Sequence, residues 1–178
     1  MSYEEIIYKY YPHDKPLRRL LLKHSSNVAE KALDIVRRHP ELGADAQFVH
    51  EASMLHDIGI FMTSAPDIHC HGTEPYILHG ILGAQILREE GLPQLARVCE
   101  RHTGTGITAE QIRSRHLPLP EADYCPETIE EQIVCYADKF FSKSHPDRRL
   151  TIEQTAHSLK KFGQEGVERF LSWARMFE

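Results

Sequence analysis

Apolar residues recur along most of the chain at the three- to four-residue spacing of an amphipathic helix. The first stripe begins at Leu17, continues through Val28 to Ile35, and stops before Gly43. Further stripes of the same period predict helices over residues 45–59, 76–91, 93–102 and 128–142, another that begins at 151, and one over 167–177. No segment alternates convincingly with the period of two typical of a half-buried strand. The pattern therefore predicts an all-α fold.

Local signals support the ends of these helices. Thr128 and Glu131 form a capping box at the start of the fifth helix. Gly59 is expected to end the second helix in the left-handed conformation that glycine adopts easily. Between the fourth and fifth helices, "LPLPEADYCPE" reads as a proline-rich loop. No linker separates two domains, so a single domain is expected over 1–178, with a core at about 17–143 and C-terminal helices at 151–178 that pack on it.

Length and charge narrow the classes of partner. The chain has 178 residues and a formal net charge of −5, with no basic run. Nucleic acid and anionic membranes are therefore not expected partners. No apolar run approaches the roughly 20 residues that span a bilayer, and the first residues are acidic where a signal peptide would be basic. We expect a cytoplasmic protein, and a homodimer is compatible with these features.

Histidine adds a candidate chemistry, because the chain contains 12 of them. Polar residues suited to metal binding interrupt the apolar stripes of five predicted helices: His24, His56, His79, His102 and Asp138. Any one of them alone is compatible with a hydrogen-bonded core residue. Five buried polar groups would each need a separate partner, whereas one shared metal site would satisfy all of them. We therefore predict a metal site in the core.

Asp57 follows His56 directly, near the predicted end of the second helix. Adjacent helical residues point about 100° apart, so both can reach one site only at the edge of a helix. A short carboxylate there can bridge two cations while His56 binds one of them. Ligands of His and Asp without thiolates suit Fe, Mn, Zn or Co better than Ca.

These residues carry a resemblance to a known family. The order of His24, the "HDIG" stretch at 56–59, His79, His102 and the "YADK" stretch at 136–139 resembles the HD-domain superfamily of metal-dependent phosphohydrolases. The resemblance covers roughly residues 17 to 143. "HGILGA" and "RHTG" are similar to the small bacterial and archaeal dinuclear members, which include dinucleoside tetraphosphate hydrolases.

The resemblance implies a dinuclear centre. By it, His24, His56 and Asp138 bind a first metal, Asp57 bridges, and His79 with His102 completes a second metal site. The implied cofactors are two divalent transition-metal ions, Fe or Mn, with Zn, Co or Ni as alternatives.

This chain departs from the family pattern at the positively charged side chain that would bind a substrate phosphate. Many members place a lysine shortly after the His-Asp pair, whereas Ile60, Phe61 and Met62 stand here. The candidate replacements are Lys139, Arg101, Lys15 and Arg18. Thr103 and Gly104 could offer a hydroxyl and a backbone N–H to an oxyanion. The loop around 69–71, with the sequence His-Cys-His, could line the pocket mouth, bind metal in a closed state, or be a flexible surface loop.

The resulting hypothesis is a phosphohydrolase that cleaves a phosphomonoester or phosphoanhydride, most simply of a nucleotide, with metal-activated water. Asp57, Lys139 and Arg101 are the candidate catalytic residues, and Lys139, Arg101, Thr103, Gly104 and Arg18 the candidate substrate-binding ones. Two other functions stay open. One is a diiron oxygenase that acts on a small diol or phosphonate, and the other is a nucleotide-binding sensor without catalysis.

Overall fold

The computed structural model describes all 178 residues and is mostly helical, which confirms the predicted fold class. Two short antiparallel hairpins accompany the helices. The α-helices are α1 (Tyr3–Tyr10), α2 (Pro16–Arg38), α3 (Ala46–Leu55), α4 (His79–Glu89), α5 (Pro93–Glu100), α6 (Ala109–Ser114), α7 (Ile129–Asp138), α8 (Ile152–Leu159) and α9 (Gln164–Phe177). The strands are β1 (Ser64–Ala65), β2 (Cys70–His71), β3 (Phe141–Ser142) and β4 (His145–Arg149). Short 3-10 helices are η1 (Pro40–Leu42), η2 (Ile60–Met62), η3 (Pro66–Ile68), η4 (Tyr76–Leu78) and η5 (Lys160–Phe162).

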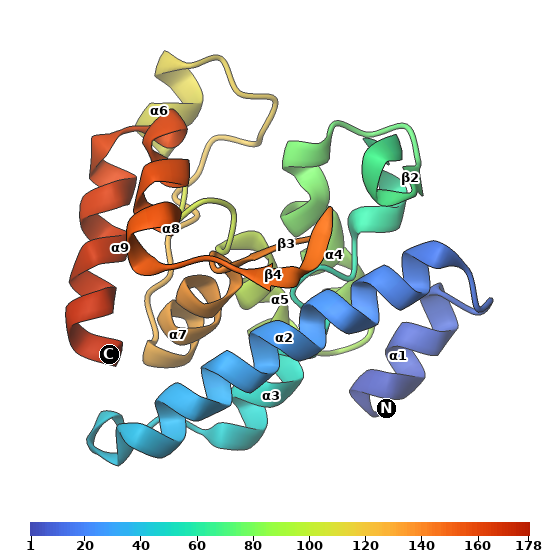
Figure 1. Ribbon diagram of the computed structural model, residues 1–178. Helices are drawn as coiled ribbons and strands as arrows, with labels where there is room; N and C mark the ends of the chain where they lie inside the picture. The colour runs from blue at the N-terminus through green and yellow to red at the C-terminus, as the bar shows by residue number, and fades with distance from the viewer.

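Helix α2 is the longest element and organises the core. It begins with Pro16 at its first turn, where the missing N–H costs no hydrogen bond. Its apolar stripe, including Leu21, Val28 and Ile35, is fully buried. Helices α3 and α7 pack against α2 and against each other, and in Figure 1 α2 crosses the view with α3 below it. These three helices therefore bring residues from distant parts of the chain to one place.

Three glycines allow α4 to pack closely against α5 and against the turn that contains Gly59. A Cβ atom at Gly80 would collide with the carbonyl oxygen of Cys99 on α5, and one at Gly59 would collide with the backbone of α4. Gly83 faces Gly59 across the same contact. The expected left-handed stop at Gly59 is wrong, because its φ is −85°. Glycine is needed there because no side chain fits between the turn and α4.

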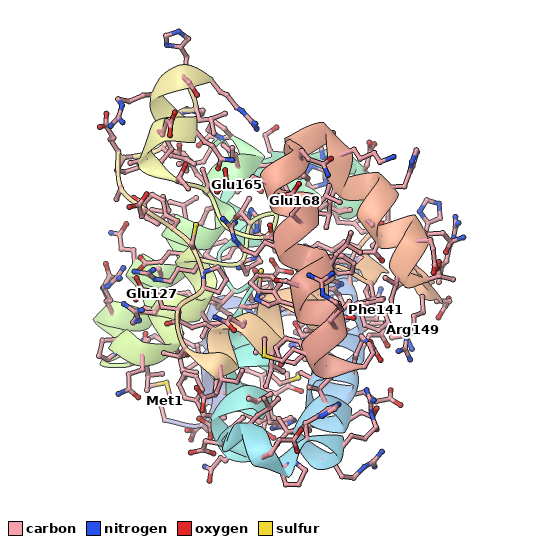
Figure 2. The ribbon with its side chains drawn as sticks, turned by 90° about the vertical axis from the view of Figure 1, so that its left-hand side faces the viewer. Met1, Glu127, Phe141, Arg149, Glu165 and Glu168 are labelled. Carbon is pink, nitrogen blue, oxygen red and sulfur yellow. The ribbon has the colours of Figure 1, made fainter.

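The C-terminal helices pack on α7. Tyr136 stacks on Phe170 of α9 with ring centroids 5.0 Å apart, and Phe177 meets Tyr136 edge to face at 5.3 Å. Lys31 of α2 is buried and forms an ion pair of 2.7 Å with Glu178. Figure 2 shows α9 running down this face of the molecule, with Glu165 and Glu168 toward its upper end. Aromatic stacking and this ion pair attach α9 to the core.

Several elements differ from the helical prediction. Helices α1 and α6 and both hairpins were not predicted from the sequence. The fifth helix ends at Asp138 rather than running to Ser142, because the chain turns there into β3 and β4. None of the helices combines the length and apolar character needed to cross a lipid bilayer.

Candidate metal centre

Five helices contribute to one buried cluster of histidines and aspartates. His24 lies in the third turn of α2, and the other members stand at helix termini or in the turns beside them. His56 caps the C-terminus of α3, Asp57 follows it, His79 opens α4, His102 follows α5 and Asp138 ends α7. Each of these residues is at most 6% exposed. The structure therefore brings together all six residues that the sequence analysis named as metal ligands.

Asp57 lies at the centre of the cluster. Its Oδ2 atom is 3.0 Å from Nε2 of His56 and 3.2 Å from Nε2 of His24. Its Oδ1 atom faces the other way, 3.3 Å from Nε2 of His102 and 3.5 Å from Nε2 of His79. The two oxygens of one carboxylate thus point to two separate pairs of imidazoles.

The donor atoms form two groups that could each hold a metal ion. One group contains His24, His56, Asp57 and Asp138, and the other contains Asp57, His79 and His102. Asp138 joins the first group through Oδ1, which is 2.9 Å from Nε2 of His24. Four and three protein ligands leave coordination positions free for water or substrate, as catalytic metal sites require.

The tautomers of three histidines can be assigned from their second nitrogen. Nδ1 of His56, His79 and His102 lies 2.7, 2.7 and 2.6 Å from the carbonyl oxygens of Ser53, Tyr76 and Cys99, respectively. A carbonyl oxygen only accepts, so each Nδ1 must donate its proton there. In the neutral rings, every Nε2 atom therefore presents a bare lone pair to the cluster.

These lone pairs are suited to a cation. The Nε2 atoms of His79 and His102 face each other at 3.0 Å, although both Nδ1 atoms carry the protons. Nε2 of His56 and Oδ1 of Asp57 are buried without a hydrogen-bond partner. Acceptors that converge in this way without donors are costly unless a cation lies between them. The donor set of imidazoles and carboxylates fits a divalent transition metal.

The charges of the cluster alter its pKa values. Burial opposes a charge on His56, but the carboxylates of Asp57 and Asp138 outweigh it and raise the pKa of His56 to about 9. Burial, aided by repulsion from His102, lowers the pKa of His79 to about 3. Burial works against the charged form of Asp57 too, yet His56 and Lys143 hold its pKa well below the usual range. In the metal-free protein the two carboxylates are therefore anionic, His56 carries a proton at neutral pH, and His79 is neutral.

Two lysines border the cluster. Nζ of Lys139 is 2.6 Å from Oδ2 of Asp138, and it also donates to the carbonyl oxygen of His102. Nζ of Lys143 is 2.8 Å from Oδ2 of Asp57, and this side chain is only 13% exposed. Lys143 was missed in the sequence, because it lies in the turn of hairpin β3–β4 rather than on a helical stripe. The available signal was a lysine five residues after Asp138.

A pocket of about 210 Å³ opens beside the cluster. His79, His102 and Asp138 form its inner part, together with Lys139 and Lys143. The rest of its wall includes Tyr76, Thr103, Gly104, Phe141, Ser158, Leu159, Lys161 and Phe162. The predicted substrate-binding residues Lys139, Thr103 and Gly104 therefore lie at one pocket.

Three predicted cations lie elsewhere. The guanidinium of Arg101 donates to the carbonyl oxygen of Cys125, at 2.8 Å, and forms an ion pair with Glu127. Arg18 donates to the carbonyl oxygen of Tyr11 and, with Lys15, lines a different pocket. The structure does not bring Arg101, Arg18 or Lys15 to the pocket beside the cluster.

The segment 69–71 forms part of a hairpin rather than part of the cluster. His69 adopts a left-handed conformation with φ of 64°, and Cys70 is fully buried. His71 is exposed and pairs with Ser64. None of these three residues belongs to either group of candidate ligands.

Three proteins of known sequence are similar to this chain. A tRNA (cytidine(56)-2'-O)-methyltransferase of Thermoplasma volcanium is 34% identical over 90% of this chain and 41% of its own length. A protein of the same name from Picrophilus torridus is 36% identical over 76% of this chain and 34% of its own length. This chain thus spans less than half of both methyltransferases. An uncharacterized protein of Methanocaldococcus jannaschii is 40% identical over 80% of this chain and 75% of its own.

Comparisons of structure and of family agree on the fold. The HD domain of the L. monocytogenes phosphodiesterase PgpH superposes with a TM-score of 0.50 and 17% identity, over 89% of this chain and 94% of that domain. The profile of the HD domain family matches residues 21–142, more than half of the chain and the whole segment that carries the cluster. This chain therefore belongs to the HD domain family of metal-dependent phosphohydrolases.

Proposed function

We propose that this protein hydrolyses a phosphomonoester or a phosphoanhydride of a nucleotide. One observation carries the proposal: two groups of candidate metal ligands share Asp57 and lie beside a pocket that three lysines line. The lysines suit an anionic substrate, and the shared carboxylate suits a pair of cations. Family membership supports the reaction class, and the pocket supports a phosphate as the group that reacts.

Each candidate ligand has a role in this proposal. His24, His56, Asp57 and Asp138 would hold one ion, and Asp57, His79 and His102 the other. Bound ions of this kind supply Lewis acidity toward a phosphoryl group and lower the pKa of a water molecule. The carbonyl groups that accept from the histidine Nδ1 atoms fix the rings, so that the Nε2 atoms stay directed inward.

Residues of the pocket would bind the substrate. Lys139 and Lys143 would neutralise the charge of the phosphoryl group, and the hydroxyl of Thr103 and the N–H of Gly104 would donate to its oxygens. Asp57 would hold the attacking water in line with the scissile bond. Arg101 and Arg18 engage other parts of the chain and have no role in this proposal.

The choice of a nucleotide has two supports. The motifs of this chain resemble those of dinucleoside tetraphosphate hydrolases, and two relatives have names that refer to a cytidine of tRNA. Both concern nucleotides as substrates, although the reactions differ. The alternative of a nucleotide sensor depended on a missing lysine, and Lys139 and Lys143 now provide positive charges at the cluster. These charges suit a phosphonate as well as a phosphate, so dependence of turnover on O₂ is what would distinguish the oxygenase alternative.

The direct test separates the nucleotide products, and measures the phosphate released, after incubation with protein prepared without chelator and loaded with Mn²⁺ or Fe²⁺. Nucleoside mono-, di- and triphosphates and a dinucleoside tetraphosphate are the substrates. We expect turnover that chelation abolishes and added metal restores. Asp57→Asn keeps the shape of the side chain but removes the shared charge, so metal affinity should fall by about 10- to 100-fold and turnover by more.

Asp67→Asn is the matched control, because Asp67 is exposed on the neighbouring η3 segment. This control should keep its metals and its rate. Turnover that survives chelation, or an Asp57→Asn variant with the wild-type rate, would contradict the proposed mechanism. Failure to cleave any of these substrates would contradict the proposed reaction.

A further inference from the structure

The outer wall of the pocket comes from outside the segment that the family profile matches. Ser158 and Leu159 end α8, and Lys161 and Phe162 belong to η5, whereas the profile stops at residue 142. We name Lys161 and Phe162 the pocket lip. The candidate metal ligands therefore lie inside the segment that the family profile matches, whereas the lip lies outside it.

Phe162 is unusual among the aromatic residues of the pocket because its ring remains available. Its exposed fraction is 42%, one of the highest values for a large apolar residue in the chain. Tyr76, by contrast, stacks on His79 at 4.6 Å with an interplanar angle of 17°. Phe141 packs against the hydrophobic core. Phe162 thus offers the pocket an aromatic ring on which no other ring of the chain stacks.

The lip is fixed relative to the cluster. Arg115 donates from Nη1 to the carbonyl oxygen of Phe162 at 2.8 Å. The turn that follows His102 is tied to α9, because Thr105 donates to the carbonyl oxygen of Gly166 at 3.0 Å. Arg169 in turn donates to the carbonyl oxygen of Thr105 at 3.0 Å. These bonds hold the lip in place before a ligand arrives, which lowers the entropic cost of binding.

The size of the pocket limits what it can enclose. Its volume of about 210 Å³ is below the roughly 300–1,000 Å³ of pockets that enclose a whole small molecule. The phosphate end of a substrate can enter toward the lysines, but a larger group attached to it must remain at the mouth. At the mouth, that group meets Phe162, and the ammonium of Lys161 lies 5.0 Å from the centroid of the same ring.

We propose that Phe162 is a stacking platform for the base of a nucleoside phosphate whose phosphate end enters the pocket. This inference rests on the proposed function and narrows its substrate class to nucleotides recognised through the face of the base. Stacking is tolerant of base identity because every base has a π-face. We therefore expect binding of several nucleotides, and weaker binding of sugar phosphates that lack a base.

The first experiment compares AMP with ribose 5-phosphate on the Mn²⁺-loaded protein. Phe162→Ala should raise the KM for AMP by about 5- to 100-fold, in line with the loss of one stacked base. It should leave kcat for AMP and both constants for ribose 5-phosphate unchanged. Phe162→Tyr should restore the wild-type KM, because it restores the ring.

Tyr8→Ala is the control for loss of an exposed aromatic residue, since Tyr8 is 51% exposed on α1 and is not part of the pocket. It should change none of these constants. Equal effects of Phe162→Ala on both substrates, or no effect on either, would overturn the platform while leaving the proposed hydrolysis intact.

A binding measurement separates the platform from the reaction. The single tryptophan of the wild type, Trp173, is 4% exposed. Phe162→Trp therefore adds an accessible fluorophore at the lip, and AMP should quench it, whereas ribose 5-phosphate should not. Quenching by AMP in a protein that cleaves none of the nucleotides tested above would support the platform and contradict the proposed function. Identical responses to AMP and ribose 5-phosphate would overturn the platform.

Discussion

Lys143 places its ammonium 2.8 Å from Oδ2 of Asp57, the same oxygen that faces His24 and His56. A divalent ion bound by that oxygen would repel the ammonium at such a distance. Lys143 lines the pocket as well, so the side chain can move from the carboxylate toward a substrate phosphate. The same lysine would then neutralise Asp57 in the metal-free protein and bind substrate in the metal-loaded one.

The first prediction follows from this movement of Lys143 from Asp57 toward the substrate phosphate. Lys143→Met removes the ammonium that competes for Asp57, so the dissociation constant for Mn²⁺ should stay equal or fall. The KM for a phosphate substrate should rise by roughly tenfold, because a charge-assisted contact worth about 1.5 kcal/mol is lost. Metal titration and steady-state kinetics measure the two effects. Lys23→Met is the control, since Lys23 is exposed. Weaker Mn²⁺ binding by Lys143→Met would show that the lysine supports the metal site instead.

The second prediction concerns the two groups of ligands. His24 belongs to the group of four, whereas His79 belongs to the group of three. His24→Ala should therefore weaken the first ion, and His79→Ala should spare it and lower the occupancy of the second. Elemental analysis of the purified variants should give close to two ions per chain for the wild type and close to one for His79→Ala. Equal loss of all metal in both variants would indicate one cooperative cluster.

The candidate ligands could be predicted because each lies at a helix position that the apolar period marks as buried. A polar residue such as His79 or His102 on that stripe is an exception that the sequence reveals by itself. Lys143 could not be found in this way, since a hairpin with strands of two and five residues has no period to read. The interaction of Arg101 with Cys125 depends on how a long loop folds back, which no local pattern encodes.

The third prediction tests why a glycine, Gly80, follows the candidate metal ligand His79. Gly80 packs on the carbonyl oxygen of Cys99, and that oxygen accepts from Nδ1 of His102. A methyl group at Gly80 should displace this carbonyl and misalign the ring. Gly80→Ala should lower stability by about 1–3 kcal/mol through overpacking and should weaken the second ion more than the first.

Thermal unfolding and elemental analysis measure these two effects of Gly80→Ala. Gly166→Ala is the control, because the nearest obstacle there is the hydroxyl of Thr105 rather than backbone. An equally stable Gly80→Ala protein with two ions would show that α4 can shift without cost.

The last prediction uses the pKa values of the metal-free cluster. The raised pKa of His56, about 9, means that its contribution to stability is complete below the unfolded value near 6.5 and is lost as pH rises through 9. The lowered pKa of His79, about 3, acts in the opposite sense, because the unfolded chain takes up a proton below 6.5 that the folded protein refuses. Metal-free protein should therefore be most stable near pH 6.5.

Bound metal should reverse the pH dependence of stability above pH 6.5. Metal ligands bind without their protons, so affinity and the stability it confers rise with pH. Between pH 6.5 and 8.5, urea unfolding should show falling stability with chelator and rising stability with excess Mn²⁺ kept under argon. His56→Gln should abolish the decline of the metal-free protein, whereas His145→Gln, at an exposed position, should keep it. Parallel slopes with and without metal would contradict a site in which Mn²⁺ takes the place of the proton on His56.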